Sequence, residues 1–146
     1  GARIMDLQEP ETKMSTTGGT EQGTVLVLDD EKTIRKKVGS AVTDSGREVR
    51  AAPDKPGVTN LIDILAVARG VGRTQIEADF DGAGYGDFKK AVAAGVVELL
   101  GPVRARYEEL RPDEAALEAT LAAGAEKARK IAAVTLVDVR ARMGFG

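Results

Sequence analysis

The sequence predicts a mainly α-helical protein, a bundle of five to six helices preceded by a flexible loop segment. First, apolar residues recur every three or four positions over most of the chain after Asp29, which is the helical period. Second, aromatic residues make up only 3% and Trp is absent, so the core must come from Ala, Val, Leu and Ile. Ala and Leu are strong helix formers, which favours helices over a β-sandwich. We find no credible pattern for a sheet.

The first 24 residues predict a loop region, because they are rich in Gly, Thr, Glu and Pro. Residues 18–24 contain three glycines and are expected to be the most mobile stretch. Residues 25–28 form a short apolar run. It is either a buried extended piece or packing that anchors the far end of the loop.

Two helices with a connection between them are expected next. Asp29 or Asp30 can cap the first, which ends at Ser45-Gly46. Residues 47–58 carry two prolines and a glycine and indicate a connection. The second helix begins at Thr59 or Asn60 and ends at Gly70. The residues expected to face inward are Ile34, Val38, Ala41 and Val42 in the first helix, and Leu61, Ile62, Leu65 and Ala68 in the second.

The remaining helices are separated by breaks. Thr74 and Glu77 have the spacing of a capping box, which predicts a short helix that ends at Gly82. Residues 84–87 indicate a turn. A long helix over 88–110 follows, which Pro102 should kink. After the break at 111–113, one apolar stripe reaches Gly124 and another runs to Gly144. The inward face of the long helix is expected to hold Phe88, Val92, Val96, Leu99, Val103, Tyr107 and Leu110.

Composition excludes several classes of function. The chain has no Cys and no His, which removes disulfides, thiolate and imidazole metal sites, and Ser-His or Cys-His nucleophilic systems. Acidic pairs at 29–30 and at Asp79 and Asp81 are explained by helix capping and a surface turn, so we expect no metal site. The net charge of −2 gives no general attraction to nucleic acid or membrane, so an RNA contact needs a local patch. No membrane span or signal peptide is visible, and the cytoplasm is the expected location.

One motif carries chemistry. The pentad Lys13-Met14-Ser15-Thr16-Thr17 can place an ammonium and hydroxyl donors around nucleotide phosphates. It does so only where a nucleotide pocket faces it, and the residues before it are too few to build one. The opening Gly1 in place of Met also indicates a fragment. From the residues alone, a disordered, hydroxyl-rich terminus with a solvated lysine remains the main alternative.

The residues resemble a known family in order along nearly the whole chain. The run Gly1-Ala2-Arg3-Ile4-Met5, followed by the pentad, is similar to the KMSKS segment of bacterial tryptophanyl-tRNA synthetases. The resemblance continues through Leu28-Asp29-Asp30, Ile34, Lys36-Lys37, residues 41–45, Pro56-Gly57, Asn60-Leu61, residues 84–89 and residues 124–128. A lone Lys-Met-Ser is weak evidence, but the ordered set with its spacing is specific.

The resemblance implies a role for each residue of the loop. The family activates tryptophan with ATP, and Lys13 would follow the leaving pyrophosphate while Ser15 and Thr17 supply hydroxyl donors. Ile4 would support the adenine edge through its backbone. ATP contacts are thus implied for Ile4, Lys13, Met14, Ser15, Thr16 and Thr17, with Mg²⁺ bound mostly through the phosphates or absent parts. Many bacterial members have a second lysine where this chain has Thr16, which puts a phosphate contact by Thr16 in doubt.

The resemblance also implies two domains and several partners. Residues 1–28 would end a Rossmann-type catalytic domain that is otherwise missing, and residues 29–146 would form the helical domain that binds the tRNA anticodon. The partners would be tRNA(Trp), ATP and tryptophan, in a full enzyme that is a homodimer with no DNA or membrane partner. Arginine suits base stacking and phosphate contact. The candidate tRNA contacts are Arg104, Arg106, Lys127, Arg129 and Lys130.

Three interpretations remain open. The chain is the C-terminal portion of a tryptophan–tRNA ligase, inactive by itself because the Rossmann half is absent. It is instead a stand-alone helical RNA-binding module derived from that enzyme. Or it is a helical interaction protein with a vestigial loop.

Overall fold

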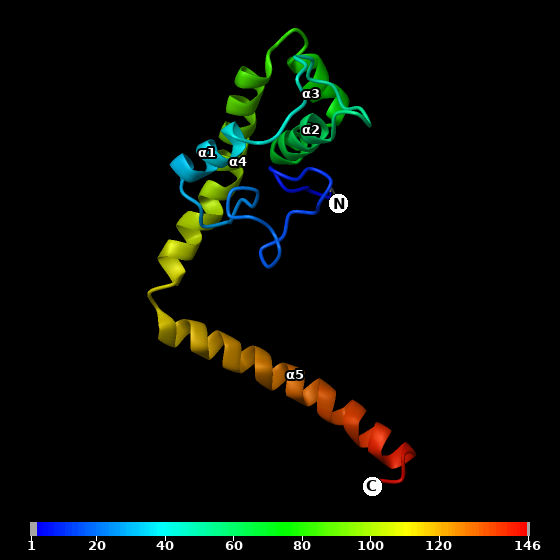
Figure 1. Ribbon diagram of the computed structural model, residues 1–146. Helices are drawn as coiled ribbons and strands as arrows, with labels where there is room; N and C mark the ends of the chain where they lie inside the picture. Colours follow the sequence, from blue (N-terminus) through cyan, green and yellow to red (C-terminus); the bar gives the residue numbers. More distant parts are fainter. Residues whose placement is uncertain (1–2, 146) are drawn as a thin grey trace. The chain divides into compact units, whose positions relative to one another are not determined.

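The computed structural model describes residues 3–145, so Gly1 and Ala2, where the resemblance begins, lie outside the described residues. The described part contains five helices and no strand, which confirms the predicted mainly α class (Figure 1). The chain divides into two compact units, Gly1–Arg104 and Ala105–Gly146. Every helix in the described range is too short or too polar to cross a lipid bilayer.

The first unit contains the hydrophobic core. Its buried apolar side chains all lie between Leu7 and Val96. Phe88 is fully buried at the centre and meets Phe80 edge-on, with ring centroids 5.1 Å apart. The N-terminal segment, blue in Figure 1, lies beside α2 (Pro56–Arg69). Of the apolar run 25–28, only Val25 packs against the core, because Leu26, Val27 and Leu28 are almost half exposed.

Helix α1 (Glu31–Gly39) begins as predicted and ends earlier. Asp30 is its N-cap, and its Oδ1 accepts the Thr33 N–H at 2.7 Å. The predicted end at Ser45 is wrong, because the Val42 N–H donates to the Leu7 carbonyl at 2.7 Å and thus leaves the helix. Val42, expected to face inward, is 45% exposed.

Helix α2 begins earlier than the predicted Thr59 or Asn60. Proline at the first helical position explains the start at Pro56, since its missing N–H needs no partner there. The end is as predicted: Gly70 adopts the left-handed conformation, with φ of 67°. The first turn of α2 lies close to the chain after α1, and a Cβ added at Gly57 would come 2.1 Å from the Val42 carbonyl oxygen.

Helix α3 (Arg73–Asp79) does not use the predicted capping box. Its N-cap is Gly72, without a side-chain cap, and Thr74 lies inside the helix. Glu77 serves a different partner, because its Oε1 accepts the Ala51 N–H at 2.7 Å. The carboxylate thus fixes the 47–55 connection rather than its own helix end.

Helix α4 (Tyr85–Leu110) includes residues predicted as a turn and runs through Pro102. Its buried face holds Phe88, Val92, Ala93 and Val96. The predicted apolar stripe continues in the sequence, but its later members are not buried. The exposed members are Leu99 at 47%, Val103 at 51%, Tyr107 at 43% and Leu110 at 42%.

The second unit contains the end of α4 and one long helix, α5 (Glu114–Arg142). Asp113 caps α5, accepting the Ala116 N–H at 3.0 Å. Gly124 does not end a helix, contrary to the prediction, and the described chain therefore has five helices. No residue of α5 is buried, and most of its large apolar side chains are exposed, among them Leu121, Ile131, Val134, Leu136 and Val137.

Candidate functional site

The base of the Lys13 loop is a short antiparallel pairing between residues 4–6 and 12–14. Met5 and Lys13 form an isolated bridge, and the Met14 N–H donates to the Ile4 carbonyl at 3.2 Å. The Asp6 N–H donates to the Thr12 carbonyl at 2.8 Å. These bonds bring Ile4 and Lys13, nine positions apart in the sequence, next to each other.

Asn60 of α2 forms hydrogen bonds to this base. Its side chain is 3% exposed, and its Oδ1 accepts the Met5 N–H at 2.8 Å. Its Nδ2 donates to the Met5 carbonyl at 2.8 Å. One amide therefore satisfies both backbone groups of Met5, and it joins the loop to α2.

Asp6 fixes the turn that follows. This carboxylate is 2% exposed, and its Oδ1 accepts the N–H groups of Gln8 at 2.8 Å and Glu9 at 3.1 Å. The Leu7 N–H donates to the Gly23 carbonyl at 2.9 Å. A Cβ at Gly23 would lie 1.8 Å from Asp6 Oδ1, so only glycine permits this approach.

Within the pentad, Met14 is the anchor and its neighbours are exposed or half-exposed. The Met14 side chain packs against the hydrophobic core. Ser15 Oγ accepts the N–H groups of Thr17 and Gly18, each at 3.3 Å, and lies 3.3 Å from Thr17 Oγ1. The Lys13 side chain is exposed, and no described carboxylate lies within ion-pair distance of its ammonium. Lys13 is thus available to bind an anion.

The far end of the loop is fastened by a buried lysine. Lys37 is 4% exposed, and its Nζ donates to the Thr24 carbonyl at 2.8 Å and to Asp29 Oδ2 at 2.7 Å. The same Asp29 oxygen accepts the Leu26 N–H at 2.9 Å. Thr24 Oγ1 donates to the Ser15 carbonyl at 3.1 Å, which links this end to the pentad. Greater mobility stays a prediction for residues 18–22, whereas Gly23 and Thr24 are buried.

These bonds gather the predicted ATP contacts around one cavity of 360 Å³. Five of the six candidates line it, and Thr17 does not. The lining residues are Arg3, Ile4, Lys13, Met14, Ser15, Thr16, Thr24 and Val25. Arg3 and Lys13 give it two cations and no acidic group. Within residues 3–145 no group of three or more acidic side chains could hold a metal.

The predicted tRNA contacts belong to two different units of the chain. Arg104 is half-buried in the first unit, and its Nη1 donates to the Asp29 carbonyl at 2.7 Å, so it anchors the segment before α1. The other four belong to the second unit. Arg106 pairs with Glu109, while Arg129 and Lys130 share Glu126, at 3.7 and 3.6 Å. Lys127 is exposed.

A polar cluster joins the start of α4 to the connection before α2. The Tyr85 hydroxyl lies 2.9 Å from both carboxylate oxygens of Asp44, and Lys55 Nζ donates to the Tyr85 oxygen at 3.0 Å. Burial acts to raise the pKa of Asp44. The bonds from the Gly46 N–H and from Tyr85, with the charge of Lys55, outweigh it, and the net pKa is lowered.

The anchors Asp6, Lys37 and Asn60 were not among the predicted site residues. For Lys37 a signal existed, since it follows Ile34 by three positions and lies on the apolar face of its helix. A polar residue on a buried face usually has a specific partner. The identity of that partner depends on contacts distant in sequence, which no local pattern contains.

Comparison with known sequences identifies the family. The family model of the tRNA synthetases class I (W and Y) matches residues 2–101. The chain is 43% identical over 147 residues to a tryptophan–tRNA ligase of Halalkalibacterium halodurans, covering 100% of this chain and 44% of the relative. It is 45% identical over 148 residues to a tryptophan–tRNA ligase of Leifsonia xyli subsp. xyli, covering 99% and 43%.

Solved structures give the same result. The crystal structure of tryptophanyl-tRNA synthetase from Mycoplasma pneumoniae superposes with a TM-score of 0.87 at 30% identity, covering 99% of this chain and 44% of that one. The Campylobacter jejuni enzyme complexed with ADP and tryptophan gives 0.70 at 27% identity, with 98% and 44% covered. The chain therefore spans less than half the length of the relatives it matches. Given the match over residues 2–101, it belongs to the class I tRNA synthetases of the tryptophan and tyrosine family.

Proposed function

We propose that this chain is the C-terminal portion of a tryptophan–tRNA ligase, which activates tryptophan with ATP and charges tRNA(Trp) in the cytoplasm. The main support is the cavity beside the Lys13 loop, which brings five predicted ATP contacts together. Residues 1–28 would end the catalytic domain, and residues 29–146 would form the helical domain that addresses the tRNA.

Lys13 is proposed to stabilise the pyrophosphate as it leaves. In such a transfer, negative charge grows on the leaving phosphates, and a cation placed beside them lowers the barrier. Lys13 suits this role because it is exposed and has no described carboxylate partner, while Met14 next to it is held by the core. The ammonium can follow the phosphates while its backbone stays fixed.

The three hydroxyl groups of the pentad differ in their hydrogen bonds and in whether they line the cavity. Ser15 Oγ accepts two backbone N–H groups, so its own proton points to Thr17 Oγ1 at 3.3 Å and would turn from there to a phosphate oxygen. Thr16 lines the cavity, whereas Thr17 lies against Ser15. We propose a phosphate contact for Ser15 first. Thr16 would contribute only a hydroxyl where many bacterial members have a lysine, and Mg²⁺ would be carried by the ATP phosphates.

ATP–pyrophosphate exchange dependent on tryptophan tests this proposal. The chain alone is expected to show none, because the parts that would bind tryptophan lie outside it. Joined to the N-terminal half of a relative such as the Halalkalibacterium halodurans enzyme, it should support exchange. Lys13→Ala should then lower kcat about 100- to 1,000-fold, the range for losing one group that stabilises developing charge. Exchange by the chain alone, or a joined enzyme indifferent to Lys13→Ala, would contradict the proposal.

The tRNA contacts proposed for the helical domain are Arg106, Lys127, Arg129 and Lys130. Arg104 is the weakest of the predicted five, because its guanidinium already serves the Asp29 carbonyl. The full enzyme is proposed to be a homodimer. If tRNA with the tryptophan anticodon binds the chain no better than other tRNA, the anticodon role is wrong, and the stand-alone RNA-binding or interaction module becomes the better interpretation.

A further inference from the structure

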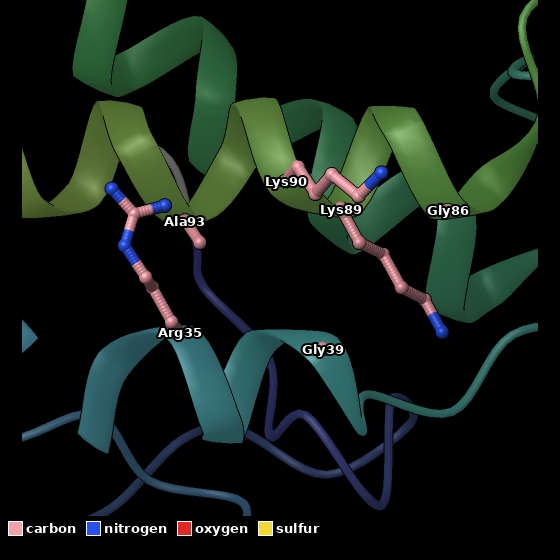
Figure 2. Close-up of a pocket in the computed structure, with 6 residues that line it drawn as sticks. All are labelled: Arg35, Gly39, Gly86, Lys89, Lys90 and Ala93. Carbon is pink, nitrogen blue, oxygen red and sulfur yellow. The ribbon is translucent and has the colours of Figure 1, made fainter. Parts of the chain in front are cut away.

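A second cavity, of 260 Å³, lies between α1 and α4, away from the Lys13 loop (Figure 2). Figure 2 shows Arg35 rising from α1 towards α4, and Lys89 extending from α4 towards the end of α1. Three of its lining residues are cationic, two are glycine and none is acidic. The full set is Arg35, Gly39, Gly86, Lys89, Lys90 and Ala93.

Two of the cations have only weak partners. Arg35 pairs with Glu31 of its own helix at 2.8 Å, and about half of each side chain is exposed. Lys90 pairs with Asp87 at 2.9 Å, with both side chains more than three-quarters exposed. Exposed pairs of this kind contribute roughly 0–1 kcal/mol, so an incoming anion can replace them at small cost.

Lys89 is held in a different way. Its Nζ donates to the Ala41 carbonyl at 2.8 Å, and no carboxylate of the described residues lies within ion-pair distance of it. Burial lowers its pKa, which means that its charged form lacks full compensation. A neutral carbonyl leaves this ammonium able to attract a further negative group.

The glycines leave room for that group. A Cβ added at Gly39 or at Gly86 would meet no atom within 4 Å. Gly86 lies in the first turn of α4, where the backbone carries partial positive charge. The last turn of α1 carries partial negative charge, which offsets that of the α4 turn. Attraction for an anion therefore comes mainly from the three cations.

We propose that this cavity binds a backbone phosphate of tRNA, an assignment that rests on the proposed function. An RNA phosphate fits better than a free one, because the cations are flexible, come from two helices and form no rigid fork of donors. Lysine and arginine side chains of this kind position a protein on a nucleic-acid backbone. A single phosphate would gain little here, whereas a polyanion gains from neighbouring contacts as well.

Fluorescence anisotropy with labelled tRNA, measured on the full 146-residue chain at several salt concentrations, tests the assignment. Each phosphate contact contributes about 0.7–0.9 to the slope of log K against log salt. Lys89→Gln should therefore reduce that slope by about one and weaken binding about five- to eightfold at 0.1 M salt. Gly86→Glu, which puts a carboxylate at the cavity wall, should weaken binding at least as much.

Matched variants distinguish the effect of charge on tRNA binding from the effects of side-chain volume and of misfolding. Gly86→Gln adds similar volume without charge and should bind more tightly than Gly86→Glu. Arg50→Gln removes an exposed cation that does not line this cavity and should leave the slope nearly unchanged. Circular dichroism identifies any variant that does not fold. If Lys89→Gln does not fold, the difference in tRNA affinity between Gly86→Glu and Gly86→Gln tests the assignment.

The outcomes distinguish this assignment from the proposed function. If wild-type protein binds tRNA and the variants bind equally well, the cavity assignment alone is overturned. If inorganic phosphate at millimolar concentration, at constant ionic strength, shifts the Gly86 and Lys89 amide resonances and tRNA does not, the source is a free anion and the RNA assignment is wrong. Absence of any tRNA binding by the wild type overturns it as well, while leaving the exchange assay as an independent test of the ligase activity.

Discussion

Four buried polar residues hold the loop: Lys37 and Asn60 join it to helices, whereas Asp6 and Thr24 bond within it. Each has partners, and no buried side-chain nitrogen or oxygen among the described residues lacks one. Their bonds go mainly to backbone groups of residues 5–9 and 24. Burying an unpaired polar group costs about 1–3 kcal/mol. Removing one of these side chains should therefore destabilise the protein through the buried partners that it leaves unpaired.

Asn60→Ala should destabilise the protein by about 2–4 kcal/mol, because both backbone groups of Met5 lose their buried partner. Urea unfolding measures the loss. Hydrogen exchange of Met5, Asp6 and Met14 should accelerate more than exchange within α4. Asn60→Asp is the matched control: it keeps the acceptor for the Met5 N–H but loses the donor. Equal exchange in wild type and Asn60→Ala would show that α2 does not hold the loop.

Tyr85→Phe should reduce the acid dependence of stability. The folded pKa of Asp44 lies below its ordinary value of 3.8, so its contribution is present above that pH and is lost as pH falls through the folded pKa. Removing the hydroxyl raises this pKa towards the ordinary value. Urea unfolding from pH 6 down to pH 2 should therefore show a smaller fall in unfolding free energy for the variant. An identical fall would exclude Tyr85 as a cause.

At the scale of elements, the sequence predicted which segments are helical better than where they begin and end. Period and capping identified α1, α2 and the long α4, and the Asp30 cap and Gly70 stop were correct. The errors arose where a distant contact decides the boundary. Val42 bonds to Leu7 in place of continuing α1, and Glu77 bonds to Ala51 in place of capping α3.

Gly57→Ala should destabilise the protein although alanine is the better helix former. Alanine gains about 1 kcal/mol of helix propensity over glycine. Its Cβ would lie 2.1 Å from the Val42 carbonyl oxygen, a backbone atom that cannot rotate away. We expect a net loss of about 1–3 kcal/mol in urea unfolding. Gly39→Ala, also helical but with open space around it, should be neutral or stabilising. A stable Gly57→Ala would show that the first turn of α2 can shift.

For the whole molecule, the hydrophobic core includes residues from only the first two thirds of the chain. Every buried apolar side chain precedes residue 97, and α5 has none. A helix with exposed Leu121, Ile131, Val134 and Val137 gains no stability from packing within its own unit. Periodicity correctly indicated a helix there. It could not indicate whether the apolar stripe is covered, because that depends on surfaces elsewhere.

Ending the chain at Pro112 should therefore leave the first unit folded. We expect the thermal midpoint to change by only a few degrees, while the helical signal in circular dichroism falls with the loss of the 29 residues of α5. Self-association in sedimentation should also decrease, since large exposed apolar surfaces promote it. Loss of a cooperative transition in the shortened chain would show that α5 stabilises the first unit.

At this scale the sequence named the residues of the candidate site, but not how the fold places them. The motif singled out the pentad and the resemblance added Ile4; five of these six residues line one cavity, and their contacts with ATP stay predictions. The dispersal of the basic candidates was not predictable, because Arg104 and Arg106, two positions apart, have unrelated partners. Nor was the cationic cavity, which needs α1 and α4 to lie beside each other.

The lysine that fastens the far end of the loop has a consequence for protein engineering. Lys37 fixes Thr24, and Asn60 fixes Met5, so both ends of the loop are held from the helices. The stretch at 16–22 between these fixed points is mostly exposed. Extra residues inserted there would lengthen the loop without moving its ends, and a fluorescent label attached there would leave the ends in place as well. Members of the family should accordingly vary in loop length within this stretch and at neither end.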